Sequence, residues 1–327
     1  MVAGAADRGA FATAGMKSHR MTTRDQAAPA RANPLAYLLL TLTALCWGAN
    51  AIFGRLAVGE VSPMALTMLR WLLVLALLGP LVQRQVRRDW PVLRRHLLFL
   101  ATMGALGFTG FNAVYYVAAH YTPAVNIGII QGSIPVFVLI GAFVAYRTRV
   151  TPLQVAGVVV TVLGVALVGT GGDLARIAAL AINRGDLLMV VACLLYAGYT
   201  VALQRRPAVA ALSLFTVLAA AALLASLPLV ALEAASGQLQ WPTTTGWIIA
   251  VLAVLFPSFA AQMFFIRGVE LIGPGRAGVF INLVPVFASI LAVAILRESF
   301  AAFQAIALGL VLGGIWLSEW GKRRAGG

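Results

Sequence analysis

The sequence predicts an all-α integral membrane protein with ten transmembrane helices arranged as two inverted five-helix repeats. Three observations lead to this prediction: long apolar runs, a one-sided distribution of basic residues, and an internal repeat at a fixed spacing. The chain has 327 residues, of which 61% are hydrophobic and only 10% are charged, and its mean hydropathy is +0.93. A soluble domain carries about 25% charged residues. So few charges suffice only for a protein whose surface mostly faces lipid.

Ten apolar runs are long enough to cross a bilayer, because a spanning helix needs about 20 mostly apolar residues. In the first half these runs are Leu35–Gly54, Pro63–Val82, Leu97–Ala118, Pro123–Tyr146 and Pro152–Thr170. In the second half they are Asp186–Leu203, Ala210–Leu232, Trp247–Ile266, Gly273–Leu296 and Ala301–Ser318. Residues 1–32 have no sustained apolar run, so we expect them to form a disordered cytoplasmic tail. Residues 319–327 are expected to form a short basic cytoplasmic tail.

The basic residues predict the orientation of these helices. With the N-terminus in the cytoplasm, 19 of the 24 Lys and Arg residues fall on the cytoplasmic side, four fall on the opposite side, and Arg70 remains within a span. Cytoplasmic loops carry an excess of Lys and Arg, so we expect both termini in the cytoplasm and the protein in the cell (inner) membrane. The net charge of +14 therefore reflects topology and indicates no nucleic-acid partner. The expected partners are the lipid bilayer and a small-molecule substrate.

The second half of the chain repeats the first at a spacing of 150 residues. Ile134-Pro135-Val136-Phe137 matches Val284-Pro285-Val286-Phe287, and the same shift pairs Gly128 with Gly278, Arg147 with Arg297, Gln154 with Gln304 and Gly164 with Gly314. We therefore expect one repeat at residues 33–170 and a second at 186–318. Because each repeat holds five spans, the second must enter the membrane in the opposite orientation, which is typical of secondary transporters.

Several motifs add a family resemblance. The first span reads Leu45-Cys46-Trp47-Gly48-Ala49-Asn50, the second contains Leu69-Arg70-Trp71, and Gln154 and Gly157 lead to Gly164. Together with the two repeated prolines, this pattern resembles the drug/metabolite transporter superfamily, in particular its EamA group. The resemblance implies a ten-helix, two-repeat exporter or importer of metabolites, often amino acids. Two positions depart from the pattern: Thr148 replaces a common acidic residue, and Ala307 replaces a glycine.

In an inverted-repeat transporter the substrate binds near the midplane, between the halves. Polar residues at that depth are candidates because their burial in lipid is costly, and aromatic residues could form the walls of a site. The candidate substrate-binding residues are Arg70, Asn50, Trp47, Asn112, Tyr115, Tyr116, Gln131, Gln262 and Asn282, with Tyr196 as a further aromatic wall. For any single one, hydrogen bonding between helices is the alternative. Pro135 and Pro285 either bend their helices around a cavity or form ordinary kinks.

Arg70 is the most unusual of these candidates. It lies near the middle of the second span, where an arginine costs at least about 2.5–3.5 kcal/mol, and no carboxylate is expected at that depth. Helix carbonyls, water or an anionic group of the substrate must therefore satisfy its five donors. The sequence leaves two main roles open: Arg70 binds an acidic or zwitterionic solute, or it ties helices together. The alternative is that it snorkels toward an interface, which its depth makes awkward.

These observations predict a secondary transporter, expected to export small metabolites such as amino acids by alternating access, with no enzymatic activity. A membrane enzyme or a sensor is the alternative. Intramembrane hydrolysis needs a Ser–His pair or paired aspartates at depth, and the sequence predicts neither. Its Cys and His residues have no metal-site spacing, and no cofactor is expected. No acid lies near a span centre, so the sequence indicates no coupling ion.

Overall fold

The computed structural model describes residues 33–173 and 182–325, and all regular secondary structure within them is helical. The expected N-terminal tail, residues 1–32, lies outside the described residues. The first half contains α1 (Pro34–Leu56), α2 (Pro63–Leu93), η1 (Arg94–His96), α3 (Leu97–Met103), η2 (Gly104–Gly110), α4 (Phe111–Ala118), α5 (Ala124–Gln131), α6 (Ile134–Tyr146) and α7 (Pro152–Gly169). The second half contains α9 (Arg184–Ala202), η3 (Leu203–Arg205), α10 (Ala211–Ala235), α11 (Thr244–Ala253), η4 (Val254–Ala260), α12 (Ala261–Ile272), α13 (Pro274–Phe280), η5 (Ile281–Leu283), α14 (Val284–Leu296) and α15 (Ala302–Ala325).

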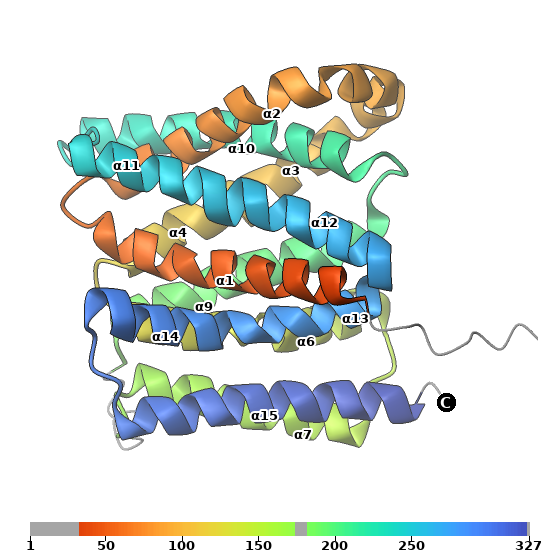
Figure 1. The fold of residues 1–327 in the computed structure, drawn as a ribbon, viewed down its shortest axis with the longest axis vertical. Coiled ribbons are helices and arrows are strands. Elements are labelled where there is room, and N and C mark those ends of the chain that lie inside the picture. Colours follow the sequence, from red (N-terminus) through yellow and green to blue (C-terminus); the bar gives the residue numbers. More distant parts are fainter. Residues whose placement is uncertain (1–32, 174–181, 326–327) are drawn as a thin grey trace, which may run out of the picture. The chain divides into compact units, whose positions relative to one another are not determined.

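Nine helical segments within the described residues are long and apolar enough to cross a membrane. Eight of them correspond singly to expected spans. The remaining segment, Pro63–Ala118, has 56 residues and joins the second and third expected spans. At about 1.5 Å per residue it is far longer than the roughly 30 Å hydrocarbon core. Figure 1 shows that this segment reverses direction at η1, after α2, so that α2 and α4 are separate helices.

Two helices continue beyond the apolar runs that were expected as spans. The second span was expected to end at Val82, but α2 continues to Leu93. The expected basic tail, residues 319–327, is helical as far as Ala325. In both places the change from apolar to basic residues ends the apolar run but not the helix, because Arg, Lys and Gln are good helix formers.

The helical breaks follow the 150-residue spacing. The π-helical segments η2 (Gly104–Gly110) and η4 (Val254–Ala260) lie at equivalent positions, and so do α6 and α14. Pro135 and Pro285 each lie in the first turn of their helix, where a missing N–H costs no helical hydrogen bond. Both helices end at an arginine in the left-handed conformation, Arg147 with φ 54° and Arg297 with φ 55°. The two segments therefore share local backbone geometry as well as sequence.

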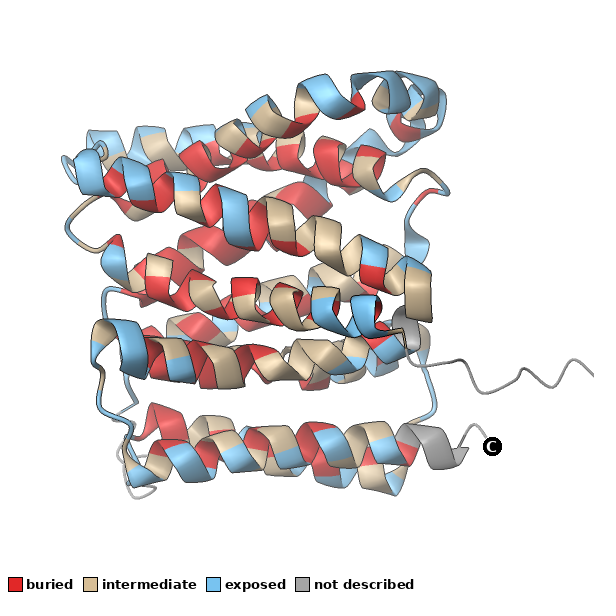
Figure 2. Cartoon of the chain, viewed as in Figure 1, coloured by how far each residue is buried: buried red, intermediate tan, exposed pale blue. Residues whose placement is uncertain are grey.

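Close contacts between small residues bring the helices together. A methyl group added at Gly128 on α5 would lie 2.4 Å from Cβ of Ala288 on α14, so these helices pack in direct contact. The glycines Gly104 and Gly107 of η2 likewise approach α10 and α9. Exposed residues lie along the outer faces of the long helices (Figure 2), and many of them are large apolar residues. An apolar exposed surface of this extent fits a lipid environment.

Candidate functional site

Three of the candidate side chains form a buried hydrogen-bonded cluster. The Nη1 group of Arg70 on α2 donates to Oδ1 of Asn50 on α1 at 2.8 Å and to the hydroxyl oxygen of Tyr116 on α4 at 2.7 Å. The Tyr116 hydroxyl lies 3.5 Å from the same Asn50 oxygen. Arg70 is only 6% exposed. The cluster therefore joins three helices of the first half, α1, α2 and α4.

The local sequence explains how these residues meet. Asn112, Tyr115 and Tyr116 share one turn of α4, since residues three and four apart lie on the same helix face. The segment before them, η2, is rich in glycine, and a methyl group at Gly107 would lie 2.4 Å from Cβ of Tyr199. The small residues of η2 thus let this part of the chain approach α9 closely, and the polar and aromatic face of α4 follows directly.

Several polar atoms on the helices of this cluster lack a partner. Among the described residues, Nε of Arg70, the Tyr115 hydroxyl, Oδ1 of Asn112 and Nε1 of Trp71 are buried without a hydrogen bond. No described carboxylate forms an ion pair with Arg70. A buried donor or acceptor left unsatisfied costs about 1–3 kcal/mol, and more if it is charged. This set of atoms could therefore bind a small polar ligand that carries both acceptors and donors.

Aromatic rings line the same region. Phe111 on α4 contacts Tyr115 (centroids 5.5 Å apart) and Tyr196 on α9 (5.1 Å). Trp71, next to Arg70, stacks on Phe108 at 4.6 Å, and the Arg70 guanidinium lies 5.7 Å from the Trp71 ring centroid. Tyr115, Tyr116 and Tyr196 were expected from the sequence as aromatic walls, whereas Trp71 and Phe111 were not. In an apolar run, nothing distinguishes an aromatic residue beside a polar cluster from one in the lipid-facing shell.

The other four candidates lie elsewhere. Nε1 of Trp47 on α1 donates to the Pro257 carbonyl in η4 at 3.1 Å, and its ring lies 5.4 Å from that of Phe265. Gln131 lies at the break between α5 and α6, where its Oε1 is buried without a hydrogen bond. Gln262 and Asn282 are half-buried. No contact found among the described residues joins any of these four to Arg70.

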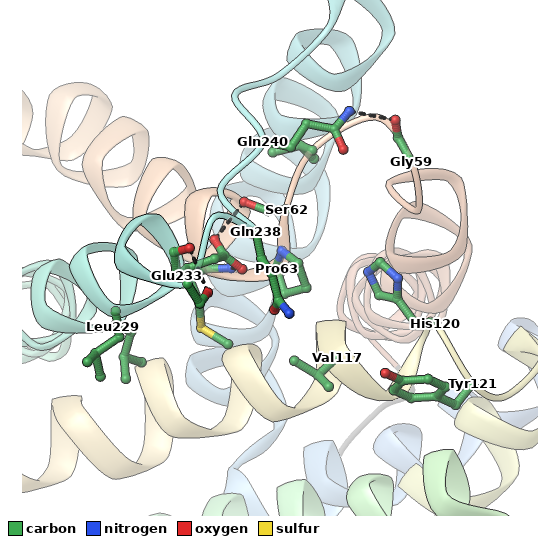
Figure 3. A pocket seen from close by; sticks show the side chains of 14 residues that line it. Gly59, Ser62, Pro63, Val117, His120, Tyr121, Leu229, Glu233, Gln238 and Gln240 are labelled. Atoms are coloured by element: carbon green, nitrogen blue, oxygen red, sulfur yellow. Dashed lines mark hydrogen bonds between the residues drawn. The ribbon is translucent and has the colours of Figure 1, made fainter.

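An open cavity lies at a different place, at the end of the bundle where α2 begins (Figure 3). It has a volume of about 490 Å³, and none of the nine candidates lines it. The Glu233 carboxylate at its edge accepts from the Ser62 hydroxyl at 2.6 Å and from backbone N–H groups in the first turn of α2. Burial, and next the positive charge of Arg55, lower the pKa of His120. Arg70 lies two helical turns along α2 from Pro63, about 10 Å from this cavity.

Comparisons with known proteins agree with this architecture. The model of the EamA-like transporter family matches residues 34–170 and again 183–320. The chain is 25% identical over 293 residues to the uncharacterized transporter YetK of Bacillus subtilis, covering 88% of each chain. It is 28% identical over 283 residues to the uncharacterized transporter YyaM of the same organism, covering 85% of this chain and 92% of YyaM. A crystal structure described only as "Crystal structure of protein" superposes with a TM-score of 0.58 over 86% of this chain and 96% of the other, at 22% identity. At this identity the last comparison shows the fold alone.

Proposed function

Because this chain belongs to the EamA-like transporter family, we propose that it is a secondary transporter that exports small metabolites such as amino acids. It is a multi-pass membrane protein, and its relatives YetK and YyaM are described as transporters. The proposal goes beyond the family in three respects, namely the class of solute, the direction of transport and the residues that bind the solute.

The repeat supports alternating access through ten membrane crossings. In this proposal the fold-back at η1 makes Pro63–Ala118, one long apolar helical segment, into two crossings, which gives each half five. The two halves then cross the membrane in opposite orientations, because five is an odd number. The shared geometry of α6 and α14 supports this pairing. Inverted halves of this kind expose a central site alternately to each side of the membrane.

The proposed class of solute is supported mainly by Arg70, whose buried charge forms no ion pair with a described carboxylate. Within the described part of the chain, its guanidinium donates to two neutral oxygens, those of Asn50 and Tyr116, and its Nε has no hydrogen-bond partner. A planar guanidinium binds a carboxylate through two parallel hydrogen bonds. The free Tyr115 hydroxyl and the free Asn112 oxygen suit an ammonium or other donor on the same solute. Small zwitterionic or acidic metabolites therefore fit the cluster best.

Counterflow in proteoliposomes tests this function. Vesicles containing the purified protein and preloaded with an unlabelled amino acid should take up the labelled one faster than empty vesicles. Arg70→Gln should weaken the apparent affinity for carboxylate-bearing solutes at least about tenfold, because a charge-assisted hydrogen bond contributes about 1.5–3 kcal/mol. Arg267→Gln is the matched control, since Arg267 is exposed and pairs with Glu270 on its own helix. Unchanged transport by the Arg70→Gln variant would show that Arg70 does not bind the solute.

A further inference from the structure

Asp186 is a buried carboxylate in the first turn of α9. From the sequence alone it was expected only to lie at the end of a membrane span. The residue is only 2% exposed. The Asn183 side chain caps α9 by accepting from the N–H groups of Gly185 and Asp186. The Asp186 carboxylate is therefore not needed as the cap of its own helix and points into the protein.

The carboxylate connects the two halves of the chain. It accepts a short hydrogen bond from the Thr122 hydroxyl, just before α5, and its Oδ1 and Oδ2 lie 3.4 and 3.2 Å from Nδ2 of Asn126 on α5. The oxygen of Asn126 in turn accepts from Nε2 of Gln304 on α15 at 2.7 Å. Thr122 and Asn126 belong to the first family match, whereas Asp186 and Gln304 belong to the second.

No described positive charge compensates this carboxylate. Arg184, two residues away, lies over the Tyr121 ring at 3.9 Å from its centroid. Glu298 accepts from the first two N–H groups of α5 and pairs with Arg55. Further ionisable groups of the described neighbouring segments include His120 and Tyr121 before α5, Cys193 on α9 and Asp173 after α7. A buried charge is costly, and because the described residues supply no countercharge, these surroundings favour a carboxylate that can take up a proton.

The surroundings favour a proton over a metal cation. The carboxylate is bonded by donors, and the nearby amide oxygens already accept hydrogen bonds: that of Asn126 from Gln304, and that of Asn183 from the first N–H groups of α9. A hard cation needs several free oxygen ligands. Within the described residues no group of three His, Cys, Asp or Glu side chains is close enough to hold a metal. A mainly apolar cavity of about 200 Å³, lined among others by Asp186, Thr170 and Val190, leaves open space beside the carboxylate.

We propose that Asp186 is the proton-binding site that couples transport to the proton gradient, a role that rests on the function proposed above. The ionised carboxylate takes one proton from water and becomes a neutral carboxylic acid. One carboxyl oxygen then carries a hydrogen that faces the Asn126 amide N–H group. Because two donors cannot bond to each other, the hydrogen bond that links Asp186 on α9 to Asn126 on α5 weakens. Proton occupancy thereby shifts the equilibrium between arrangements of the two halves, because each arrangement binds the proton with a different affinity.

Infrared spectroscopy tests the site without any solute. A step from mildly alkaline to mildly acidic pH on the full-length protein in vesicles should produce a protonated carboxyl band. The band should be lost in Asp186→Asn and kept in Glu233→Gln, a matched carboxylate that also bonds a hydroxyl and a helix start. Thr122→Val should shift the frequency of the band, because it removes the hydroxyl bonded to the same oxygen. Absence of the band in the wild type, its survival in Asp186→Asn or an unshifted band in Thr122→Val would each overturn the proposal.

A transport assay then tests whether solute movement is coupled to the proton gradient. With a solute identified by counterflow, an imposed pH gradient should raise wild-type accumulation severalfold. Asp186→Asn should keep counterflow but accumulate the solute equally with and without the gradient. Gradient-driven accumulation by this variant would refute the coupling role. If the wild type carries no solute at all, the proposed function fails, whereas the infrared experiment still decides whether Asp186 binds a proton.

Discussion

Glu298 follows α14, and its carboxylate caps the start of α5 in the other half of the chain. It accepts from the N–H groups of Ala124 (2.9 Å) and Val125 (3.0 Å), and one of its oxygens lies 3.7 Å from Nε of Arg55. A negative charge at a helix N-terminus is stabilising because it satisfies free N–H groups and complements the helix dipole. The equivalent position of the first repeat holds Thr148, which is exposed, so this ion pair has no counterpart there.

We therefore predict that Glu298→Gln lowers stability. The amide keeps one acceptor oxygen but loses the charge, which should cost about 0.5–2 kcal/mol, an estimate that allows for partial solvent screening of the Arg55 pair. The thermal unfolding midpoint of the detergent-solubilised protein measures the effect. Glu270→Gln, at an exposed pair within one helix, serves as the control and should leave the midpoint unchanged. Equal midpoints for both variants would contradict the capping role.

At the level of the element, α7 and α15 form a pair held together by small residues. A methyl group added at Gly157 on α7 would lie 2.4 Å from the carbonyl oxygen of Gly314 on α15 and 2.3 Å from Oγ of Ser318. A backbone carbonyl cannot move aside as a flexible side chain can. The close approach of these two helices therefore depends on glycine, as is common where membrane helices pack.

Gly157→Ala is accordingly predicted to separate the pair. The overpacking should cost about 1–3 kcal/mol and lower the thermal unfolding midpoint. Gly309→Ala is the matched control, because an added methyl group at Gly309 on α15 meets no atom within 4 Å. Since alanine forms helix better than glycine, this second variant should be neutral or slightly stabilising. A loss of stability in Gly309→Ala as large as that in Gly157→Ala would show that the packing argument is wrong.

For the whole molecule, the distribution of Lys and Arg predicts the orientation, with both termini in the cytoplasm. An alkaline phosphatase reporter fused after Thr170 should be active, because the segment between α7 and α9 then lies outside the cytoplasm, where that enzyme folds. The same reporter fused after Arg206 should be silent. The reverse pattern would overturn the orientation, and activity at neither or both positions would contradict the number of crossings between them.

The positions of the expected spans could be predicted from the sequence because each is an apolar run that must bury its backbone polar groups within its own helix. The helix ends at Leu93 and Ala325 could not, since hydropathy reports the lipid boundary and not the end of the hydrogen-bonded helix. The breaks at η2 and η4 were also missed. Glycine and proline are frequent in membrane helices, so their presence alone does not indicate a π-helical segment.

The sequence by itself determined that the chain is a membrane protein of two related halves, because composition and the 150-residue spacing are properties of the linear chain. Only the tertiary structure decided which polar residues meet: Asn50, Arg70 and Tyr116 share hydrogen bonds, whereas the Trp47 side chain bonds to the Pro257 carbonyl. It also decided that Asp186, at the end of a span, is buried against Asn126. The physical reason is that a residue's depth follows from its place along one helix, whereas its partners depend on how other helices rotate and pack against it.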